Sequence, residues 1–101
     1  MRKHTKIYID SLGYDSCDFM PCEITGSRGV DVHHIVNREN RIENLMLLTR
    51  VKHIELGEIK SKNAYTLRKH REFLEVNGVK FSNKWFEEQI QKYEAYEVCE
   101  G

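Results

Sequence analysis

The chain has 101 residues, with 16 basic and 16 acidic side chains and a formal net charge of zero. This length predicts a single domain, residues 1–101, with a modest hydrophobic core. No apolar run approaches the length of a membrane span and no signal peptide is recognisable, so we expect no membrane partner.

The charges are distributed unevenly along the chain. Residues 1–80 carry 14 Lys+Arg against 11 Asp+Glu, whereas residues 81–101 carry 2 against 5. A mildly basic body is thus followed by an acidic tail, which is compatible with a polyanionic partner. The three cysteines, Cys17, Cys22 and Cys99, show no disulfide-framework spacing, and their odd number is typical of a reduced, cytoplasmic compartment.

The first part of the chain gives few structural signals. Residues 1–5 are basic and are expected to be frayed. Residues 6–10 alternate in the manner of a short strand but also fit the start of a helix, and the sequence leaves both open. Turn formers dominate residues 11–19, and residues 22–29 end in a tight Thr-Gly-Ser-Arg-Gly connection.

Residues 30–36 are predicted to form a short strand that carries two adjacent histidines, His33 and His34. Successive side chains of a strand point to opposite faces. We therefore expect the two imidazoles to separate, with one ring holding a metal ion and the other facing a substrate. A polar turn, residues 37–41, then leads through Asn44 into a second apolar strand.

That second strand covers residues 45–48 and is followed by a helix from residue 50 to about residue 60, with Thr49 as its N-cap. His53 lies in the first turn, where the positive end of the helix disfavours imidazolium. Neutral imidazole is the form that binds a metal. A break is expected near Gly57, because glycine costs roughly 1 kcal/mol in a helix interior.

This order of elements resembles the HNH, or ββα-metal, nuclease family. His33 and His53 take its metal-ligand positions, His34 its general-base position and Asn44 its middle asparagine. The preceding residues 21–26, Pro-Cys-Glu-Ile-Thr-Gly, are similar to the Cys-x-x-Cys-Gly lead-in of the family. The resemblance covers residues 18–57, a little over a third of the chain, and an HH-then-N-then-H pattern with apolar flanks is fairly specific.

The resemblance implies an α+β fold. Its ββα-metal core, with a short antiparallel hairpin, would cover about residues 22–60, and a helical extension would cover about residues 63–98.

Two departures from the family pattern bear on metal binding. Many relatives hold a structural zinc with two Cys-x-x-Cys pairs, but the four corresponding positions here are Cys22, Thr25, Thr49 and Lys52. One thiolate cannot form a closed tetrahedral site, so we expect no structural zinc. Some relatives add a third metal-binding histidine, and that position is Gly57. Glu58 is a candidate extra ligand that the spacing does not require.

The function implied by the resemblance is metal-dependent hydrolysis of DNA phosphodiester bonds, with double-stranded DNA as the partner. His34 would activate water, His33 and His53 would hold one divalent ion, and Asn44 would hold the loop and the His34 ring. The products would carry a 5′-phosphate and a 3′-hydroxyl. Nitrogen ligands suit Zn, Ni, Co or Mn, and Mg can serve with a water-rich shell. Small stand-alone domains of this type occur in bacterial cells and in phage-infected hosts.

Four basic residues near the histidines are candidate nucleic-acid contacts. Arg38 and Arg41 lie in the polar turn, and Arg50 and Lys52 lie on the predicted helix that carries His53. The turn arginines would be well placed to contact phosphates, but ordinary solvated loop charges are an equally good interpretation.

Two further helices are predicted after the site. The first covers residues 63–77 and ends at Gly78, with an apolar stripe that includes His70, which we interpret as a buried core histidine rather than a ligand. Arg68, Lys69 and Arg71 flank this stripe and are interpreted as a solvated face. The second covers residues 83 to about 98, with Ser82 as N-cap and a Phe81–Phe86 staple. Its aromatic residues indicate core packing or a homodimer contact, because the helix is acidic.

Two rival functions remain open. A nucleic-acid-binding module with the ββα-metal fold but without turnover is the first. The missing zinc cysteines are compatible with it, but the retention of all four HNH positions argues against it. A structural zinc site formed by His33, His34 and His53 is the second, and the poor geometry of adjacent histidines for sharing one ion argues against it.

Overall fold

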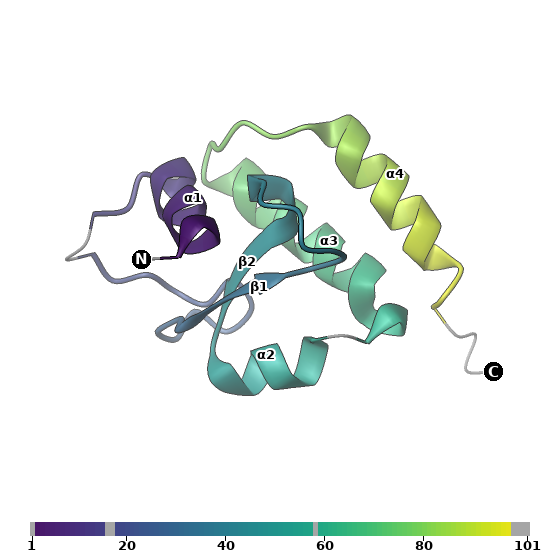
Figure 1. Ribbon diagram of the computed structural model, residues 1–101, viewed down its shortest axis with the longest axis horizontal. Helices are drawn as coiled ribbons and strands as arrows, with labels where there is room; N and C mark the ends of the chain where they lie inside the picture. Colours follow the sequence, from purple (N-terminus) through teal and green to yellow (C-terminus); the bar gives the residue numbers. More distant parts are fainter. Residues whose placement is uncertain (1, 16–17, 58, 98–101) are drawn as a thin grey trace.

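The computed structural model describes residues 2–15, 18–57 and 59–97. Within these residues the fold is α+β, as predicted, with four α-helices and one two-stranded antiparallel sheet. Figure 1 shows the hairpin at the centre of the molecule, with helices on both sides of it. In chain order the elements are α1 (Lys3–Leu12), β1 (Asp31–His34), the short 3-10 helix η1 (Ile42–Asn44), β2 (Leu45–Leu48), α2 (Arg50–Leu56), α3 (Lys60–Val76) and α4 (Asn83–Glu94).

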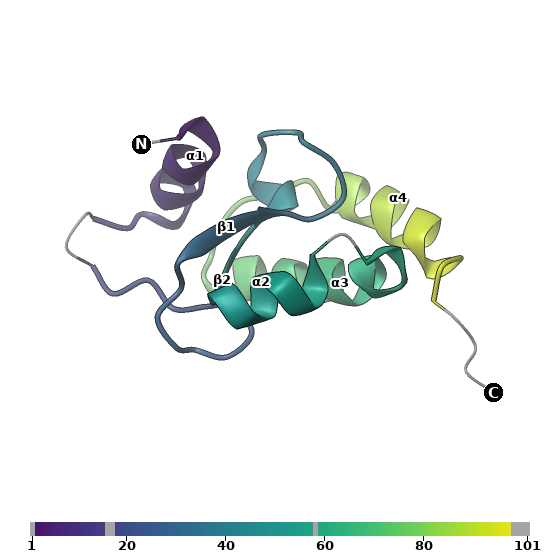
Figure 2. The ribbon, with the colours of Figure 1, turned by 60° about the horizontal axis from the view of Figure 1, so that its bottom comes forward.

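The hairpin separates two apolar clusters. All four residues of β2 are buried, and they alternate between the clusters: Leu45 and Leu47 pack with Tyr8 of α1, whereas Met46 and Leu48 pack with the side chains of α3 and α4. Figure 2 shows the hairpin between α1 and the pair of helices α2 and α3. A strand that is covered on both faces needs no polar alternation, which is why β2 is a continuous apolar run.

The register of the hairpin places the two adjacent histidines. His33 pairs with Met46 and His34 pairs with Leu45. Because cross-strand partners share a face, His33 lies on the α2–α3 side and His34 on the α1 side. The predicted separation of the two rings is therefore confirmed. Strand β1 is shorter than the predicted residues 30–36, although hydrogen bonds from the Val30 and Ile35 amides continue the pairing at both ends.

Two helix boundaries differ from the predictions. Thr49 caps α2 as predicted, since its Oγ1 accepts a hydrogen bond of 3.2 Å from the Lys52 amide. However, α2 ends at Leu56 instead of about residue 60, and α3 begins at Lys60 instead of residue 63. The predicted break at Gly57 is thus present, and a Cβ at Gly57 would approach the His53 carbonyl oxygen to 2.6 Å. Glu58 lies outside the described residues.

The expectation of a frayed N-terminus is wrong, and the ambiguity over residues 6–10 is resolved as a helix. Helix α1 begins at Lys3, and its Tyr8 is fully buried between α1 and β2. The Tyr8 hydroxyl donates a 2.6 Å hydrogen bond to Glu23 Oε2. A buried anchor of this kind holds α1 against the hairpin, and the sequence pattern gave no sign of it.

Glu23 also joins α1 to α3. Its Oε1 lies 2.6 Å from His70 Nδ1, and His70 Nε2 lies 2.6 Å from the Ile42 carbonyl oxygen. The side chains of Glu23 and His70 are both fully buried. His70 is thus a hydrogen-bonded core histidine, as interpreted from the sequence. We call the chain of contacts from Tyr8 through Glu23 and His70 to Ile42 the Glu23 network.

Helix α4 covers the outer side of α3. Ser82 caps it, as predicted, by accepting a 3.2 Å hydrogen bond from the Trp85 amide, and the Phe81 and Phe86 rings lie 5.3 Å apart. The helix ends at Glu94, short of the predicted end near residue 98. Trp85 and Tyr93 are buried, which supports core packing for these aromatic side chains. On the surface Arg68 pairs with Glu94 and Glu97, and Arg71 pairs with Glu87.

Candidate functional site: a cleft lined by histidines

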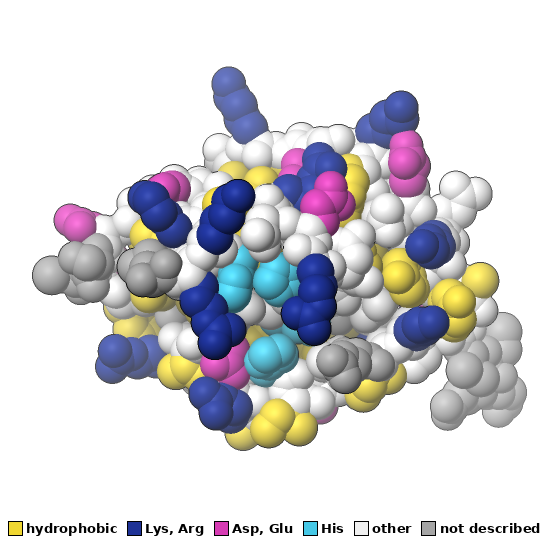
Figure 3. All heavy atoms as spheres, in the orientation of Figure 1, with side chains coloured by type: hydrophobic (Ala, Val, Ile, Leu, Met, Phe, Trp, Pro, Cys, Tyr) yellow, Lys and Arg dark blue, Asp and Glu magenta, His cyan; other side chains and the backbone are white. Residues whose placement is uncertain are grey.

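A cleft runs along the exposed end of the hairpin between α1 and α3. Figure 3 shows histidine side chains gathered on this face with Lys and Arg around them. We call it the histidine cleft. Its lining residues are Arg2, His4, Val32, His33, His34, Ile35, Val36, Asn37, Arg38, Asn40, His53, Ile54, Gly57, Lys60, Asn63 and Tyr93.

His33 is the enclosed histidine of the cleft. The residue is only 5% exposed, and its Nε2 is buried without a hydrogen-bond partner among the described residues. Burial, reinforced by the neighbouring His53 and His34, lowers the pKa of His33 to about 4. The ring is therefore neutral at physiological pH. A neutral, unpartnered imidazole nitrogen in a cleft is what a metal ligand requires.

His53 faces His33 from α2, with 4.9 Å between the two ring centroids. Because α2 has only 7 residues, His53 lies in its last turn and not in the first turn that the sequence predicted. Its Nδ1 lies 3.1 Å from Asp31 Oδ2. Since a carboxylate accepts, the Asp31 contact favours the tautomer with hydrogen on Nδ1 and a lone pair on Nε2. The carboxylate is also bound by Arg50 Nε at 2.8 Å. Burial alone would raise the pKa of Asp31, but the hydrogen bonds from His53 and Arg50 lower it.

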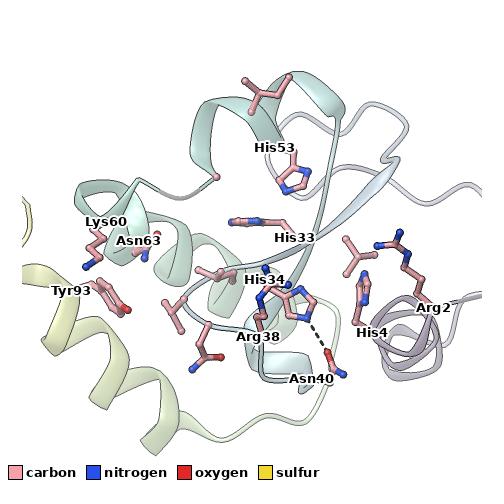
Figure 4. A pocket seen from close by; sticks show the side chains of 16 residues that line it. Arg2, His4, His33, His34, Arg38, Asn40, His53, Lys60, Asn63 and Tyr93 are labelled. Atoms are coloured by element: carbon pink, nitrogen blue, oxygen red, sulfur yellow. Dashed lines mark hydrogen bonds between the residues drawn. The ribbon is translucent and has the colours of Figure 1, made fainter.

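His34 lies on the opposite face of β1, in the open part of the cleft. Its Nε2 is 2.9 Å from Asn40 Oδ1 (Figure 4). The ring of His4, on α1, lies 4.7 Å from the His34 ring between centroids. Burial, together with the charges of His34 and Arg2, lowers the pKa of His4. His34 is thus flanked by an amide from the turn and an imidazole from α1.

Asn44 organises the turn, and its side-chain hydrogen bonds go to the backbone and side chain of the turn and not to the His34 ring. Its Oδ1 accepts a 3.0 Å hydrogen bond from the Val36 amide, and its Nδ2 donates to the carbonyl oxygens of Asn37 and Glu39 at 2.9 and 3.0 Å. The residue is fully buried. The expected loop-pinning role fits these contacts. The direct partner of the His34 ring is Asn40, which the pinned turn carries.

Of the four predicted nucleic-acid contacts, Arg38 lines the histidine cleft and the other three do not. Arg38 is exposed and lines the cleft. Arg41 pairs with Glu43 at 2.9 Å and lies over the Trp85 ring, so it belongs to the packing of the turn.

The other two are on α2. Arg50 is held by Asp31 as described above, and Lys52 pairs with Glu55 at 3.0 Å. Neither residue lines the cleft. The cationic residues that do line it, besides Arg38, are Arg2 and Lys60.

The resemblance would place structural-zinc ligands at Cys22, Thr25, Thr49 and Lys52, and of these four side chains Cys22 alone is a thiol. The Cys22 residue is buried, and its thiol is hydrogen bonded to Thr25 and to backbone groups that include Thr49. Burial acts to raise the pKa of Cys22, but these hydrogen bonds outweigh it and lower the pKa. Lys52 is paired with a glutamate. Cys22, Thr25 and Thr49 thus form a hydrogen-bonded cluster, whereas the Lys52 ammonium is turned to Glu55. The absence of a structural zinc stays a prediction.

Several residues of the cleft were not identified from the sequence. His4 and Arg2 belong to a segment that was expected to be frayed, and only the fold of α1 brings them beside β1. Asn40 was treated as part of a polar turn. Asp31 precedes the histidine pair by two residues, and an acidic residue at the start of a histidine-bearing strand was a signal that could have suggested a partner for His53.

No protein-family model, curated protein sequence or solved structure matches this chain. In the described residues no helix has the length and hydropathy needed to cross a lipid bilayer.

Proposed function

We propose that the chain is an HNH-type endonuclease that hydrolyses DNA phosphodiester bonds with one divalent metal ion. One observation carries the proposal: two adjacent histidines of β1 have opposite environments. His33 is enclosed, neutral and unpartnered at Nε2, and it faces His53. His34 stands in an open cleft with an amide partner. The environment of His33 suits a metal ligand, and the environment of His34 suits a general base.

The side chains of His33 and His53 fit a divalent ion. An ion bound by two imidazole nitrogens at about 2.1 Å each, at a tetrahedral angle, needs those nitrogens roughly 3.4 Å apart. Rings with centroids 4.9 Å apart can reach that separation with small rotations. The unpaired Nε2 of His33 costs free energy until something binds it. When bound, a divalent ion would neutralise charge on the phosphate and stabilise the leaving oxygen.

His34 is the proposed general base. With Asn40 Oδ1 as the acceptor, His34 Nε2 carries hydrogen and Nδ1 holds the lone pair. Nδ1 takes a proton from a water molecule while the water oxygen bonds to phosphorus. The bond from phosphorus to the 3′ oxygen breaks, and this oxygen takes a proton from solvent. Asn44 supports the step indirectly, because it fixes the turn that carries Asn40.

The cations around the cleft suit a polyanionic substrate. Arg2 approaches from α1, Arg38 from the turn and Lys60 from the start of α3, so positive charge surrounds the histidines on several sides (Figures 3 and 4). Such a ring of charge attracts phosphates without reading sequence.

A plasmid-nicking assay tests the proposal. The parent chain should cut supercoiled DNA with at least one of Mn, Mg, Co, Ni or Zn, and EDTA should stop it. His34→Ala should lower the rate by a factor of about 10²–10⁴, since that is what a general base contributes. Calorimetry should give it the parental metal affinity, because the ring is not a ligand.

Lys84→Ala serves as the control, because Lys84 is an exposed cation of α4 away from the cleft. It should cut as the parent does. A parent chain that binds DNA but cuts with none of the metals would instead indicate the binding module without turnover. Cleavage by His34→Ala at the parental rate would remove the assigned base.

A further inference from the structure

Asn63 carries the second buried side-chain atom of the cleft that has no hydrogen-bond partner among the described residues. It lies in the first turn of α3, is 5% exposed, and its Oδ1 is enclosed without a hydrogen bond among the described residues. Other buried polar side chains of the described chain are bonded: Asn44 to the turn, Thr66 to the Lys62 carbonyl, and His70 to Glu23. An enclosed acceptor left unpaired costs free energy, and a bound water molecule or ion is what commonly satisfies one.

The two unpartnered atoms face one cleft. Within the described residues, His33 Nε2 and Asn63 Oδ1 are the buried side-chain nitrogen and oxygen atoms without partners, and both residues line the histidine cleft. Figure 4 shows the His33 ring extending into the space on whose far side Asn63 lies. A lone pair on nitrogen and an amide oxygen share an affinity for a cation or for the water around one.

The enclosure of these atoms limits the size of what can reach them. A nucleobase or a phosphate needs exposed surface to contact, whereas a water molecule or an ion fits a small polar space that offers it several partners. An anion is not favoured at Oδ1 itself, because an amide oxygen has no hydrogen to donate to it. The unpaired oxygen therefore indicates a small hydrogen-bond donor or a cation on the α3 side of His33.

We propose that Asn63 accepts a hydrogen bond from a water of the divalent ion's coordination shell and so forms the third side of the metal site. This inference rests on the proposed function, since it deepens the site formed by His33 and His53. Asn63 is a positioning residue here and not a direct ligand. It would supply, from a helix outside the ββα unit, the polar contact that glycine at position 57 cannot provide.

Calorimetric titration of the full chain with Mn²⁺ tests the inference without an activity assay. Asn63→Leu should weaken Mn²⁺ binding by about 10–100-fold, the effect typical of losing an outer-shell partner. Asn63→Asp should bind at least as tightly as the parent, because a carboxylate accepts the same hydrogen bond and adds charge. Thr66→Val is the matched control on the same helix, since the Thr66 hydroxyl bonds its own backbone, and it should keep the parental affinity.

The possible results distinguish a failure of the role assigned to Asn63 from a failure of the proposed metal site. Parental Mn²⁺ affinity in both Asn63 variants, with binding lost in His33→Ala, would overturn the role of Asn63 and leave the metal site intact. A parent chain that binds no Mn²⁺ at all would overturn the metal site itself and this inference with it. Should Asn63→Leu fail to fold, Asn63→Asp and Asn63→Ser decide, because both keep a polar group: Asp must bind more tightly than Ser.

Discussion

His70 and His33 are both buried histidines, and they differ in what surrounds their ring nitrogens. His70 has both nitrogens in hydrogen bonds of 2.6 Å, one to Glu23 and one to the Ile42 carbonyl. His33 is 5% exposed, and its Nε2 has no partner among the described residues. Burial is therefore nearly equal, but the Glu23 network satisfies one ring and the histidine cleft leaves the other unsatisfied. Unsatisfied polarity, and not burial, distinguishes the candidate site from the core.

This difference has an energetic meaning. A fully bonded buried pair stabilises the fold only while both partners are present, because removing one leaves the other desolvated and unpaired. An unpartnered buried nitrogen destabilises the fold until a ligand binds it. Replacing a buried histidine should therefore lower the free energy of unfolding in the Glu23 network and raise it in the histidine cleft.

The largest effect is expected in the Glu23 network. His70→Leu should lower the free energy of unfolding by about 3–5 kcal/mol, because it leaves the buried Glu23 carboxylate without its imidazole partner and with the Tyr8 hydroxyl as its remaining 2.6 Å contact. Urea denaturation measures the change. The double variant Glu23→Leu/His70→Leu should lose less than the sum of the two single variants, since it leaves no unpaired charge. A loss below 1 kcal/mol in His70→Leu would show that the network is not what joins α1 to α3.

A smaller effect of opposite sign is expected at His33. His33→Leu should raise the free energy of unfolding of the metal-free chain by about 1–3 kcal/mol, because it removes an unpaired buried polar group at similar volume. The same variant should lose divalent-ion affinity. Together these results would place His33 among residues kept for function at a cost in stability.

The pH dependence of this gain has a defined sign. The folded-state pKa of His33 is about 4 and the unfolded value is 6.5, so the unfolded chain binds more protons between these values. The parent therefore loses stability as pH falls from about 6.5 towards about 4, and His33→Leu lacks this loss. The advantage of the variant should grow over that window in urea titrations at several pH values. A gain that is constant or shrinks on acidification would contradict the environment assigned to His33.

The sequence was informative where local chemistry decides the structure. The β2 residues, the Thr49 and Ser82 caps and the break at Gly57 follow from apolar runs, N-cap hydroxyls and glycine, all of which act over a few residues. The separation of His33 and His34 follows from strand geometry alone. These local signals were enough to predict the hairpin, the helix that follows it and the placement of His33 and His34 on opposite faces of β1.

Contacts between segments that are far apart in the chain could not be predicted from local sequence patterns. The place of α1 depends on Tyr8 meeting Glu23, 15 residues later, and that contact brings His4 to His34. The core position of His70 depends on Glu23, 47 residues away. The sequence indicated that His70 was buried but not with which partner, and it gave no reason to join Asn63 to the histidines. Pairings of this kind are set by the packing of the whole chain.

The smallest effect is expected from removing metal. Strands β1 and β2 and helix α2 are held by the apolar clusters on both faces of β2 and by the Glu23 network, and none of these contains His33 or His53. A divalent ion bound at His33 and His53 should add stability only by mass action, through its concentration relative to its dissociation constant. Excess EDTA should therefore abolish DNA cleavage while the far-UV circular dichroism stays nearly unchanged. A structural zinc would behave differently, because its binding free energy is folding free energy. Collapse of the helical signal in EDTA, with about one zinc per chain bound through Cys22, would show that the cluster around Cys22 is a metal site after all.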